Sequence, residues 1–184
     1  MYTCKQIGYS TVSFEAAVQS GYCQFRRCQM GNHFCAMINL VRHADGRYEL
    51  PGVTARRFQN EAKFPGGTNK NSPWEDPAQT LIREAMEETG LKPISYKLIH
   101  KDEKPGHTKY FFVCLKVEGQ FDGPKTVKEP DGDELEVRMW DLDDFDRHLF
   151  RNHRPAFMKV CRTLRDADSS FSNNYPEICR KLDE

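Results

Sequence analysis

The chain has 184 residues, and its 27 Lys and Arg residues balance 27 Asp and Glu residues, so the formal net charge is zero. This balance excludes a basic domain that binds nucleic acid through bulk charge. A hydrophobic content of 38% together with zero net charge also argues against a disordered chain. The length predicts one domain over residues 1–184.

The N-terminal residues and the cysteines favour a cytoplasmic protein with no membrane partner. No apolar segment resembles a signal peptide or approaches the ~20 residues of a membrane-spanning helix. Seven cysteines, an odd number, favour free thiols in a reducing compartment. Cys23, Cys28, His33 and Cys35 leave a zinc knuckle open as an alternative. However, their spacing lacks the short Cys pairs that structural zinc sites favour.

Most strands are expected in the first two thirds of the chain. A short strand is predicted near residues 9–14, and the apolar run Phe34–Arg42 predicts a buried strand. Asp45-Gly46 then predicts a tight turn into a return strand at residues 48–53. Further strands are expected at residues 94–100, 110–117 and 135–140.

The last third of the chain reads mainly as helix. Apolar spacing predicts helices at residues 142–150 and 155–165. Residues 166–184 are rich in Ser and Asn, so we expect a loose tail with a short helical turn near residues 176–182. Strands interrupted by helices indicate an α+β fold.

One further helix is predicted between Asp76 and Gly90. Asp76, Pro77 and Gln79 form a strong start signal, namely a capping carboxylate, Pro at the first helical position and Gln at the capping-box position. Gly90 is a typical stop. An apolar stripe for the core repeats at helical spacing between them, formed by Ala78, Leu81, Ile82, Ala85 and Met86.

Beside this stripe, Glu84, Glu87 and Glu88 occupy positions i, i+3 and i+4 of the predicted helix. They therefore project from one side and repel one another. One interpretation is a solvated acidic face. The alternative is a site for a hard divalent cation such as Mg²⁺, which prefers oxygen ligands and turns the repulsion into coordination.

The wider pattern decides between these interpretations. Residues 83–91 read R-E-U-x-E-E-x-G-U, where U is aliphatic, Glu75 stands eight positions before Arg83, and Phe-Pro-Gly-Gly occupies residues 64–67. This pattern resembles the signature of the Nudix hydrolase family. The resemblance implies an α/β/α sandwich with a mixed β-sheet.

The sequence departs from the family signature in the loop before the helix. Seven residues separate Gly67 from Glu75, where the family has five. We interpret this as a two-residue insertion, because Pro65-Gly66-Gly67 supplies the expected tight turn. With rigid spacing from Glu75, Asn69 would instead replace the glycine.

The resemblance implies Mg²⁺- or Mn²⁺-dependent hydrolysis of a pyrophosphate bond in a nucleoside diphosphate linked to another moiety. It further assigns roles to individual residues. Glu84, Glu87, Glu88 and the Gly66 carbonyl would bind the metal, with Glu84 also a candidate base. Arg83 would orient the acids and Glu75 would support them. Members differ in the base, and the run Glu136–Trp140 resembles a strand of the family. Glu134 or Glu136 is therefore a second candidate, as the base or as an extra metal ligand. The alternative interpretation of these acids is a polar loop that leads into a strand.

Substrate recognition is less defined by the sequence. Arg42, Arg57, Lys63 and Gly67 are candidate contacts for substrate phosphates, although each cation taken singly also reads as a surface charge. The expected partner is a nucleotide-type small molecule, chosen among nucleotide sugars, ADP-ribose, dinucleotides and nucleoside triphosphates. Capped RNA and a homodimer are left open. The alternative function is a non-catalytic Nudix-fold module that binds nucleotides or regulates.

Overall fold

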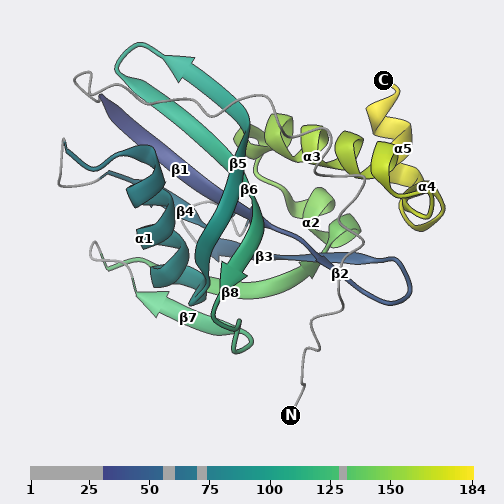
Figure 1. The fold of residues 1–184 in the computed structure, drawn as a ribbon, viewed down its shortest axis with the longest axis horizontal. Helices are drawn as coiled ribbons and strands as arrows, with labels where there is room; N and C mark the ends of the chain where they lie inside the picture. The colour runs from purple at the N-terminus through teal and green to yellow at the C-terminus, as the bar shows by residue number, and fades with distance from the viewer. Residues whose placement is uncertain (1–30, 56–60, 70–73, 129–131) are drawn as a thin grey trace.

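The computed structural model describes residues 31–55, 61–69, 74–128 and 132–184 (Figure 1). The strand expected near residues 9–14 lies outside the described residues, as do Cys23, Cys28 and Arg57. In the described part of the chain, no helix is both long and apolar enough to cross a membrane.

A mixed four-stranded sheet forms the centre of the molecule. Its strands lie in the order β4 (Gly66–Thr68), β1 (Asn32–Asn39), β6 (His107–Glu118) and β5 (Lys92–Lys104). β1 runs parallel to β6, whereas the β4–β1 and β5–β6 pairs are antiparallel. The expected strands at residues 94–100 and 110–117 are therefore present and extend further at their ends.

A second, antiparallel sheet orders its strands as β2 (Val41–Arg42), β3 (Tyr48–Ala55), β8 (Glu134–Asp141) and β7 (Lys125–Lys128). The expected hairpin joins β2 to β3, and Gly46 adopts a φ of 83° in its turn. The single strand predicted over Phe34–Arg42 is wrong, because the chain changes sheets at Leu40. An apolar run does not reveal that its two ends pair with different partners.

Helices cover both faces of the mixed sheet (Figure 1). α1 (Pro77–Thr89) packs on one face through Leu81 and Ala85, which contact Phe112 and its apolar neighbours. On the other side, α2 (Leu142–His148), a 3₁₀ turn (Arg151–His153) and α3 (Arg154–Ala167) contribute to the larger core. The prediction of an α/β/α sandwich with a mixed sheet is confirmed.

The C-terminal segment is a packed part of this core, so the prediction of a loose tail over residues 166–184 is wrong. It forms α4 (Phe171–Asn174) and α5 (Pro176–Leu182). Phe171, Tyr175 and Ile178 are fully buried, and Leu182 is nearly so. These apolar residues recur at helical spacing, so they gather on one face even though the residues between them are polar.

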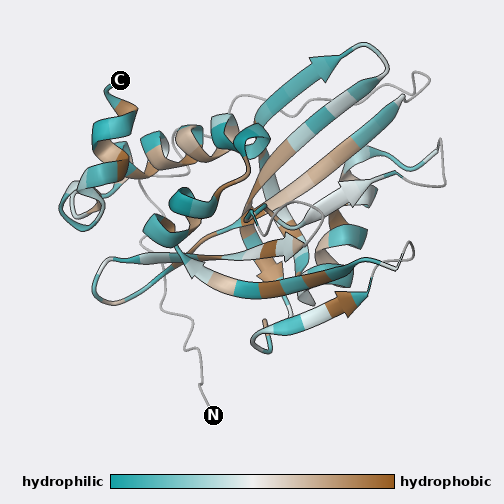
Figure 2. Ribbon diagram, turned by 180° about the vertical axis from the view of Figure 1, so that it is seen from behind, coloured by the Kyte–Doolittle hydropathy of each residue, from teal (hydrophilic) through white to brown (hydrophobic). Residues whose placement is uncertain are grey.

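Hydropathy follows this arrangement. Figure 2 shows hydrophobic residues concentrated in the central strands, whereas the outer end of the β5–β6 hairpin is hydrophilic. The core on the α1 side of the mixed sheet is a separate, smaller cluster that includes Cys35 and Met37. α1 is therefore fixed to the sheet by one apolar face, and Arg83 on its other flank donates to the Thr68 carbonyl of β4.

Candidate active site

The ends of α1 are fixed as the sequence predicts. The Asp76 side chain accepts a hydrogen bond from the Gln79 amide at 2.8 Å, and the Gln79 side chain accepts one from the Asp76 amide at 2.9 Å. Gly90 ends the helix with a φ of 75° and donates its amide to the Met86 carbonyl. Because both ends are capped, the helix places its acidic residues at defined positions.

Arg83 is the centre of the site. Its Nε and Nη2 donate to the two Glu75 carboxylate oxygens at 2.8 and 3.1 Å, and Nη2 also donates to the Thr68 carbonyl at 2.9 Å. Its Nη1 donates to Glu84 at 2.7 Å and to Glu87 at 3.2 Å. A planar guanidinium suits this task, because its donors lie in a fixed fork. Arg83 therefore contacts three carboxylates, those of Glu75, Glu84 and Glu87.

Electrostatics reinforce this arrangement. The hydrogen bond from Arg83 lowers the pKa of Glu75, and partial burial of that carboxylate only partly opposes the shift. The same bond, together with Glu84, raises the pKa of the guanidinium. Glu75 therefore stays ionised and Arg83 stays protonated under ordinary conditions. Arg83 is thus a shared partner of Glu75 and Glu84.

The glycine turn before the helix makes room for two of the acids. A Cβ added at Gly67 would overlap the carboxylate of Glu84, and one added at Gly66, where φ is 151°, would overlap the Cys35 carbonyl oxygen. The Gly66 amide donates to the Glu88 carboxylate at 2.7 Å. Glu84 and Glu88 are only 2% and 3% exposed, so both carboxylates lie against this turn.

The predicted metal ligands are close together but do not form a ready-made centre. In the part of the chain that the structure describes, no three carboxylate, imidazole or thiol groups are arranged to hold a metal ion. Glu84 and Glu87 both accept from Arg83, and Glu88 accepts from the Gly66 amide. Their oxygen donors still fit Mg²⁺, which typically takes one or two carboxylates and completes its shell with water and substrate phosphates.

Three other candidate residues lie on or beside the second sheet: Arg42 on β2, Lys63 paired with Val53 of β3, and Glu136 on β8. Arg42 is on β2, where its guanidinium donates to Asp168 at 2.8 Å, so the structure does not bring it to the acidic helix. Lys63 lies just before the glycine turn, and its ammonium stands over the Phe150 ring. Glu136 is exposed on β8 opposite Thr54 and Thr126.

The zinc alternative gains nothing from the two of its residues that are described. His33 is buried on β1, with its two ring nitrogens near Gly31 and Thr80. Cys35 is fully buried on the same strand, and burial raises the pKa of its thiol. A raised thiol pKa opposes the thiolate that zinc requires.

Sequence reasoning missed the buried polar contact that Thr80 of the same helix makes. Its side chain is fully buried beneath α1 and lies 2.9 Å from the Nε2 atom of His33. The available signal was its position, since Thr80 lies one turn before Glu84 on the same helix.

Comparison with known proteins identifies the family. Residues 36–161 match the NUDIX domain model, which is more than half of the chain, and the chain therefore belongs to the NUDIX domain family. No significant match is found among curated protein sequences.

Solved structures share the fold at low sequence identity. A MutT NUDIX hydrolase from Burkholderia pseudomallei aligns at 20% identity and a TM-score of 0.50, covering 70% of this chain and 97% of that one. An ADP compounds hydrolase aligns at 16% identity and a TM-score of 0.55, and the alignment covers 74% of this chain and 75% of that one. The NUDIX domain of Shewanella oneidensis NrtR, complexed with ADP ribose, aligns at 16% identity and a TM-score of 0.53. This alignment covers 82% of this chain and 97% of that one. At these identities the likeness establishes the fold.

Proposed function

We propose that this NUDIX protein is a divalent-metal-dependent hydrolase of a pyrophosphate bond in a nucleoside diphosphate linked to another moiety. The observation that carries the proposal is the excess of carboxylates around Arg83. Glu75, Glu84 and Glu87 all contact this one guanidinium. A cluster left with net negative charge beside a glycine turn is suited to bind a cation.

The residues that would hold Mg²⁺ or Mn²⁺ are Glu84, Glu87, Glu88 and the Gly66 carbonyl. When bound, the metal offsets charge on the phosphate oxygens and lowers the pKa of an attacking water. Glu84 is the candidate that accepts the proton of this water, because Arg83 fixes its carboxylate in place. Glu136 remains the second candidate for the base. Lys63 and Gly67 remain candidate phosphate contacts, as does Arg57, which lies outside the described residues.

A substrate panel with and without Mg²⁺ tests the proposal. The panel contains a nucleotide sugar, ADP-ribose, a dinucleotide, a nucleoside triphosphate and a capped RNA. We expect metal-dependent turnover that falls at least about a hundredfold in Glu87→Gln and in Glu88→Gln, as when a catalytic electrostatic element is lost. Glu177→Gln is the matched control, because Glu177 also pairs with an arginine on a helix, 2.9 Å away on α5.

Two outcomes would contradict this assignment. Unchanged turnover in both variants would remove the metal role of the acids. Absence of turnover with every substrate, together with tight nucleotide binding, would favour the second candidate function, a non-catalytic nucleotide-binding module. The structural likeness to a NUDIX domain complexed with ADP ribose is the observation that keeps this second function in view.

We infer a cytoplasmic location for the protein. Cys35, Cys114, Cys161 and Cys179 carry free thiols in the described part of the chain. Free thiols suit a reducing compartment. Fractionation of cells that express the protein tests this inference, and recovery with secreted proteins would contradict it.

A further inference from the structure

The peptide unit between Thr68 and Asn69 connects the mixed sheet to the acidic cluster. β4 is an edge strand of this sheet, paired with β1, and α1 lies beside it (Figure 1). The Thr68 carbonyl oxygen accepts from the Nη2 atom of Arg83 at 2.9 Å, and the Asn69 amide donates to the His33 carbonyl oxygen of β1 at 3.2 Å. Because a peptide unit is planar, these two contacts hold one rigid group from opposite sides.

The side chain of Asn69 completes the pairing with β1. Its Oδ1 atom accepts a hydrogen bond from the His33 backbone amide at 2.9 Å, and Asn69 is only 8% exposed. The next step of the β4–β1 register places Asn69 opposite His33, where antiparallel strands normally exchange two bonds between backbone groups. Here a side-chain oxygen replaces one backbone acceptor, and β4 ends at Thr68. The main chain of Asn69 therefore does not need to continue the strand.

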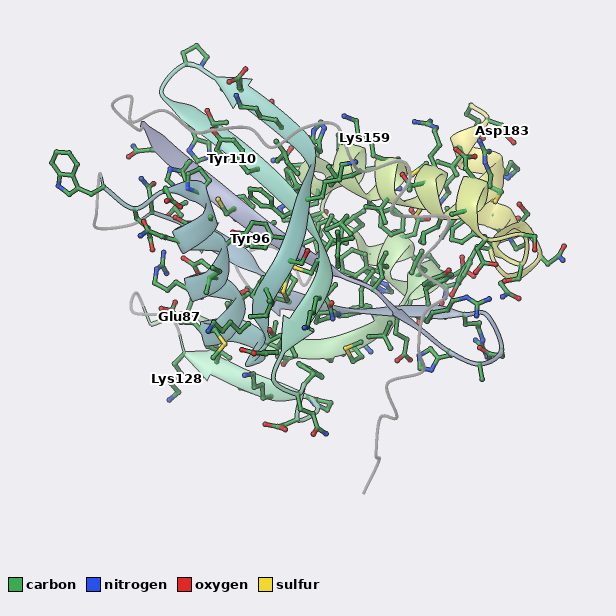
Figure 3. The ribbon with its side chains drawn as sticks, in the orientation of Figure 1. Glu87, Tyr96, Tyr110, Lys128, Lys159 and Asp183 are labelled. Carbon is green, nitrogen blue, oxygen red and sulfur yellow. The ribbon has the colours of Figure 1, made fainter. Side chains whose placement is uncertain are left out.

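Arg83 extends this connection to the acids. Its Nη2 atom also donates to Glu75 at 3.1 Å. Its Nη1 atom donates to Glu84 at 2.7 Å and to Glu87, which Figure 3 labels on α1, at 3.2 Å. Because the guanidinium is planar, an anchor on Nη2 also restricts the position of Nη1. Hydrogen bonds and planar groups thus form a continuous series from β1 to the acids of α1.

Asn69 lies where the sequence departs from the family signature. Rigid spacing from Glu75 would put Asn69 in place of the family glycine. In the structure the residue against the Glu84 carboxylate is instead Gly67, whose added Cβ would overlap that group. An asparagine that ends the strand with its own side chain allows the chain to leave the sheet here without displacing the carbonyl that Arg83 uses.

We propose that Asn69 is a positioning residue: its side chain, bonded to β1, holds the Thr68 carbonyl in place and thereby fixes the Arg83 guanidinium against the acids of α1. In this role Asn69 acts through Arg83 and needs no contact with substrate or metal. The kinetic consequence rests on the proposed hydrolase function, whereas the structural consequence does not.

The kinetic test removes and then restores the acceptor oxygen. Asn69→Leu removes it at nearly constant shape, and we expect kcat at saturating Mg²⁺ to fall about tenfold with KM changed less than about twofold, since supporting residues of this kind typically contribute about 10–100-fold. Asn69→Asp keeps the oxygen and should return kcat to within about threefold of wild type. Asn174→Leu on α4 is the control and should leave kcat unchanged, because Asn174 also bonds a distant backbone group, the Asp45 carbonyl, at 3.3 Å.

A double-mutant cycle tests whether the effect passes through Arg83. In an Arg83→Lys protein the ammonium lacks the planar fork that joins the Thr68 carbonyl to the acids. Adding Asn69→Leu to that protein should lower kcat by less than about twofold, whereas independent effects would multiply. An unchanged kcat in Asn69→Leu, no restoration in Asn69→Asp, or a full further loss in the Arg83→Lys protein would each overturn the proposal.

A test by NMR uses the metal-free protein and needs no turnover. In the wild type, a scalar coupling across the hydrogen bond should join the His33 amide nitrogen to the side-chain carbonyl carbon of Asn69, and the Nε–H of Arg83 should exchange slowly with solvent. In Asn69→Leu that exchange should accelerate at least about tenfold, whereas Asn69→Asp and Asn174→Leu should stay near the wild-type rate. Absence of the coupling, or unchanged Arg83 exchange in Asn69→Leu, would overturn the proposal.

The two tests separate this proposal from the proposed function. A wild-type protein without turnover, but with the expected coupling and slow Arg83 exchange, would contradict the hydrolase function and leave the positioning role intact. Normal turnover without the coupling would do the reverse. If Asn69→Leu fails to fold, the coupling in the wild-type protein still decides.

Discussion

The acidic flank of α1 and the C-terminal helices lie at opposite ends of the molecule, as the labels of Glu87 and Asp183 show in Figure 3. Both regions bury carboxylates beside cations. On α1, the single guanidinium of Arg83 serves several carboxylates. In the C-terminal region the proportion is reversed, because the buried Asp146 receives both Arg154 from α3 and Lys181 from α5.

This difference in charge balance distinguishes a candidate cation-binding site from a buried ion pair that holds helices together. Asp146 is a 4% exposed carboxylate with two cationic partners, so its charge is fully compensated and its role is to hold α2, α3 and α5 together. Around Arg83 the negative charge is in excess, which costs stability and leaves capacity to bind a further cation. The comparison predicts that substitutions in the C-terminal region affect stability, whereas those around Arg83 affect activity.

The largest expected effect is on stability and follows from Asp146→Asn. Removing one partner of a buried ion pair typically costs 3–5 kcal/mol. We expect about 3 kcal/mol, because Arg154 and Lys181 stay partly exposed and regain water. Denaturant unfolding measures this loss, and kcat of the folded protein should not change. Asp144→Asn is the control, since Asp144 pairs with Arg147 on the exposed side of α2 and should show no measurable loss. A loss of activity without a loss of stability in Asp146→Asn would break the comparison.

Gly67→Ala should have the opposite effect and lower kcat more than stability. The added Cβ overlaps the Glu84 carboxylate, which must move away from Arg83 or from the turn. Displacing a reacting group by about 1 Å can cost about a hundredfold in rate, or about 2.7 kcal/mol of transition-state stabilisation. Steady-state kinetics measure this effect, and Gly31→Ala is the control, because nothing lies within 4 Å of its added Cβ. Equal kcat in both variants would show that the turn does not position Glu84.

Tyr175→Phe tests a neutral contact of the C-terminal region. The Tyr175 hydroxyl accepts from the Tyr48 amide and donates to the Tyr48 carbonyl oxygen, and this contact joins the residue between α4 and α5 to β3. Without it a buried amide loses its partner, so we expect the free energy of unfolding to fall by about 2 kcal/mol. Tyr96→Phe, at a half-buried tyrosine of β5, should leave thermal unfolding unchanged. An equally stable Tyr175→Phe protein would show that apolar packing alone fixes the C-terminal helices.

The smallest effect concerns pH and His153, which lies between Phe34 and Phe64 in the larger core. Burial lowers the pKa of His153 to about 3 from its usual 6.5. Below pH 6.5 the unfolded chain therefore binds a proton at His153 that the folded protein does not bind. The free energy of unfolding consequently falls as the pH falls. Each pH unit lowers the free energy of unfolding by at most about 1.4 kcal/mol, so we expect a loss of about 1 kcal/mol between pH 7 and pH 5.5.

His153→Asn checks this assignment, because its side-chain oxygen can replace Nδ1 as the acceptor for the Phe64 amide. Denaturant unfolding of the variant should lose most of the slope between pH 7 and pH 5.5. A slope that persists would assign the proton uptake to other groups, such as His33, whose pKa burial also lowers.

The success of sequence reasoning differs between the same two regions. α1 could be predicted at both ends, because Asp76, Gln79 and Gly90 act within a few residues of the chain. In the tail the short helical turn expected near residues 176–182 is present as α5, but the packing of the tail was not predicted, because its Ser- and Asn-rich composition hid the helical spacing of Phe171, Tyr175 and the apolar residues that follow. Amino-acid composition does not distinguish the faces of a helix, whereas packing depends on which residues lie on the same helix face.

The residues of the candidate site also differ in how far the sequence predicted their positions. Arg83, Glu84 and Glu75 could be named from their spacing, and the structure brings them into contact. The placement of Arg42 could not be predicted, because Asp168, its partner, lies 126 positions away in the sequence. A single basic residue gives no indication of which distant carboxylate it will meet.

The sequence by itself determined the family, the capped helix and the acids on its flank, because these depend on spacing within about 25 residues. The tertiary structure alone decided that the apolar run Phe34–Arg42 divides between two sheets and that the last helices complete the core. It also decided that Thr80 meets His33 beneath the acidic helix, 47 positions away in the chain. These features depend on pairing between segments far apart in sequence, which local patterns do not specify.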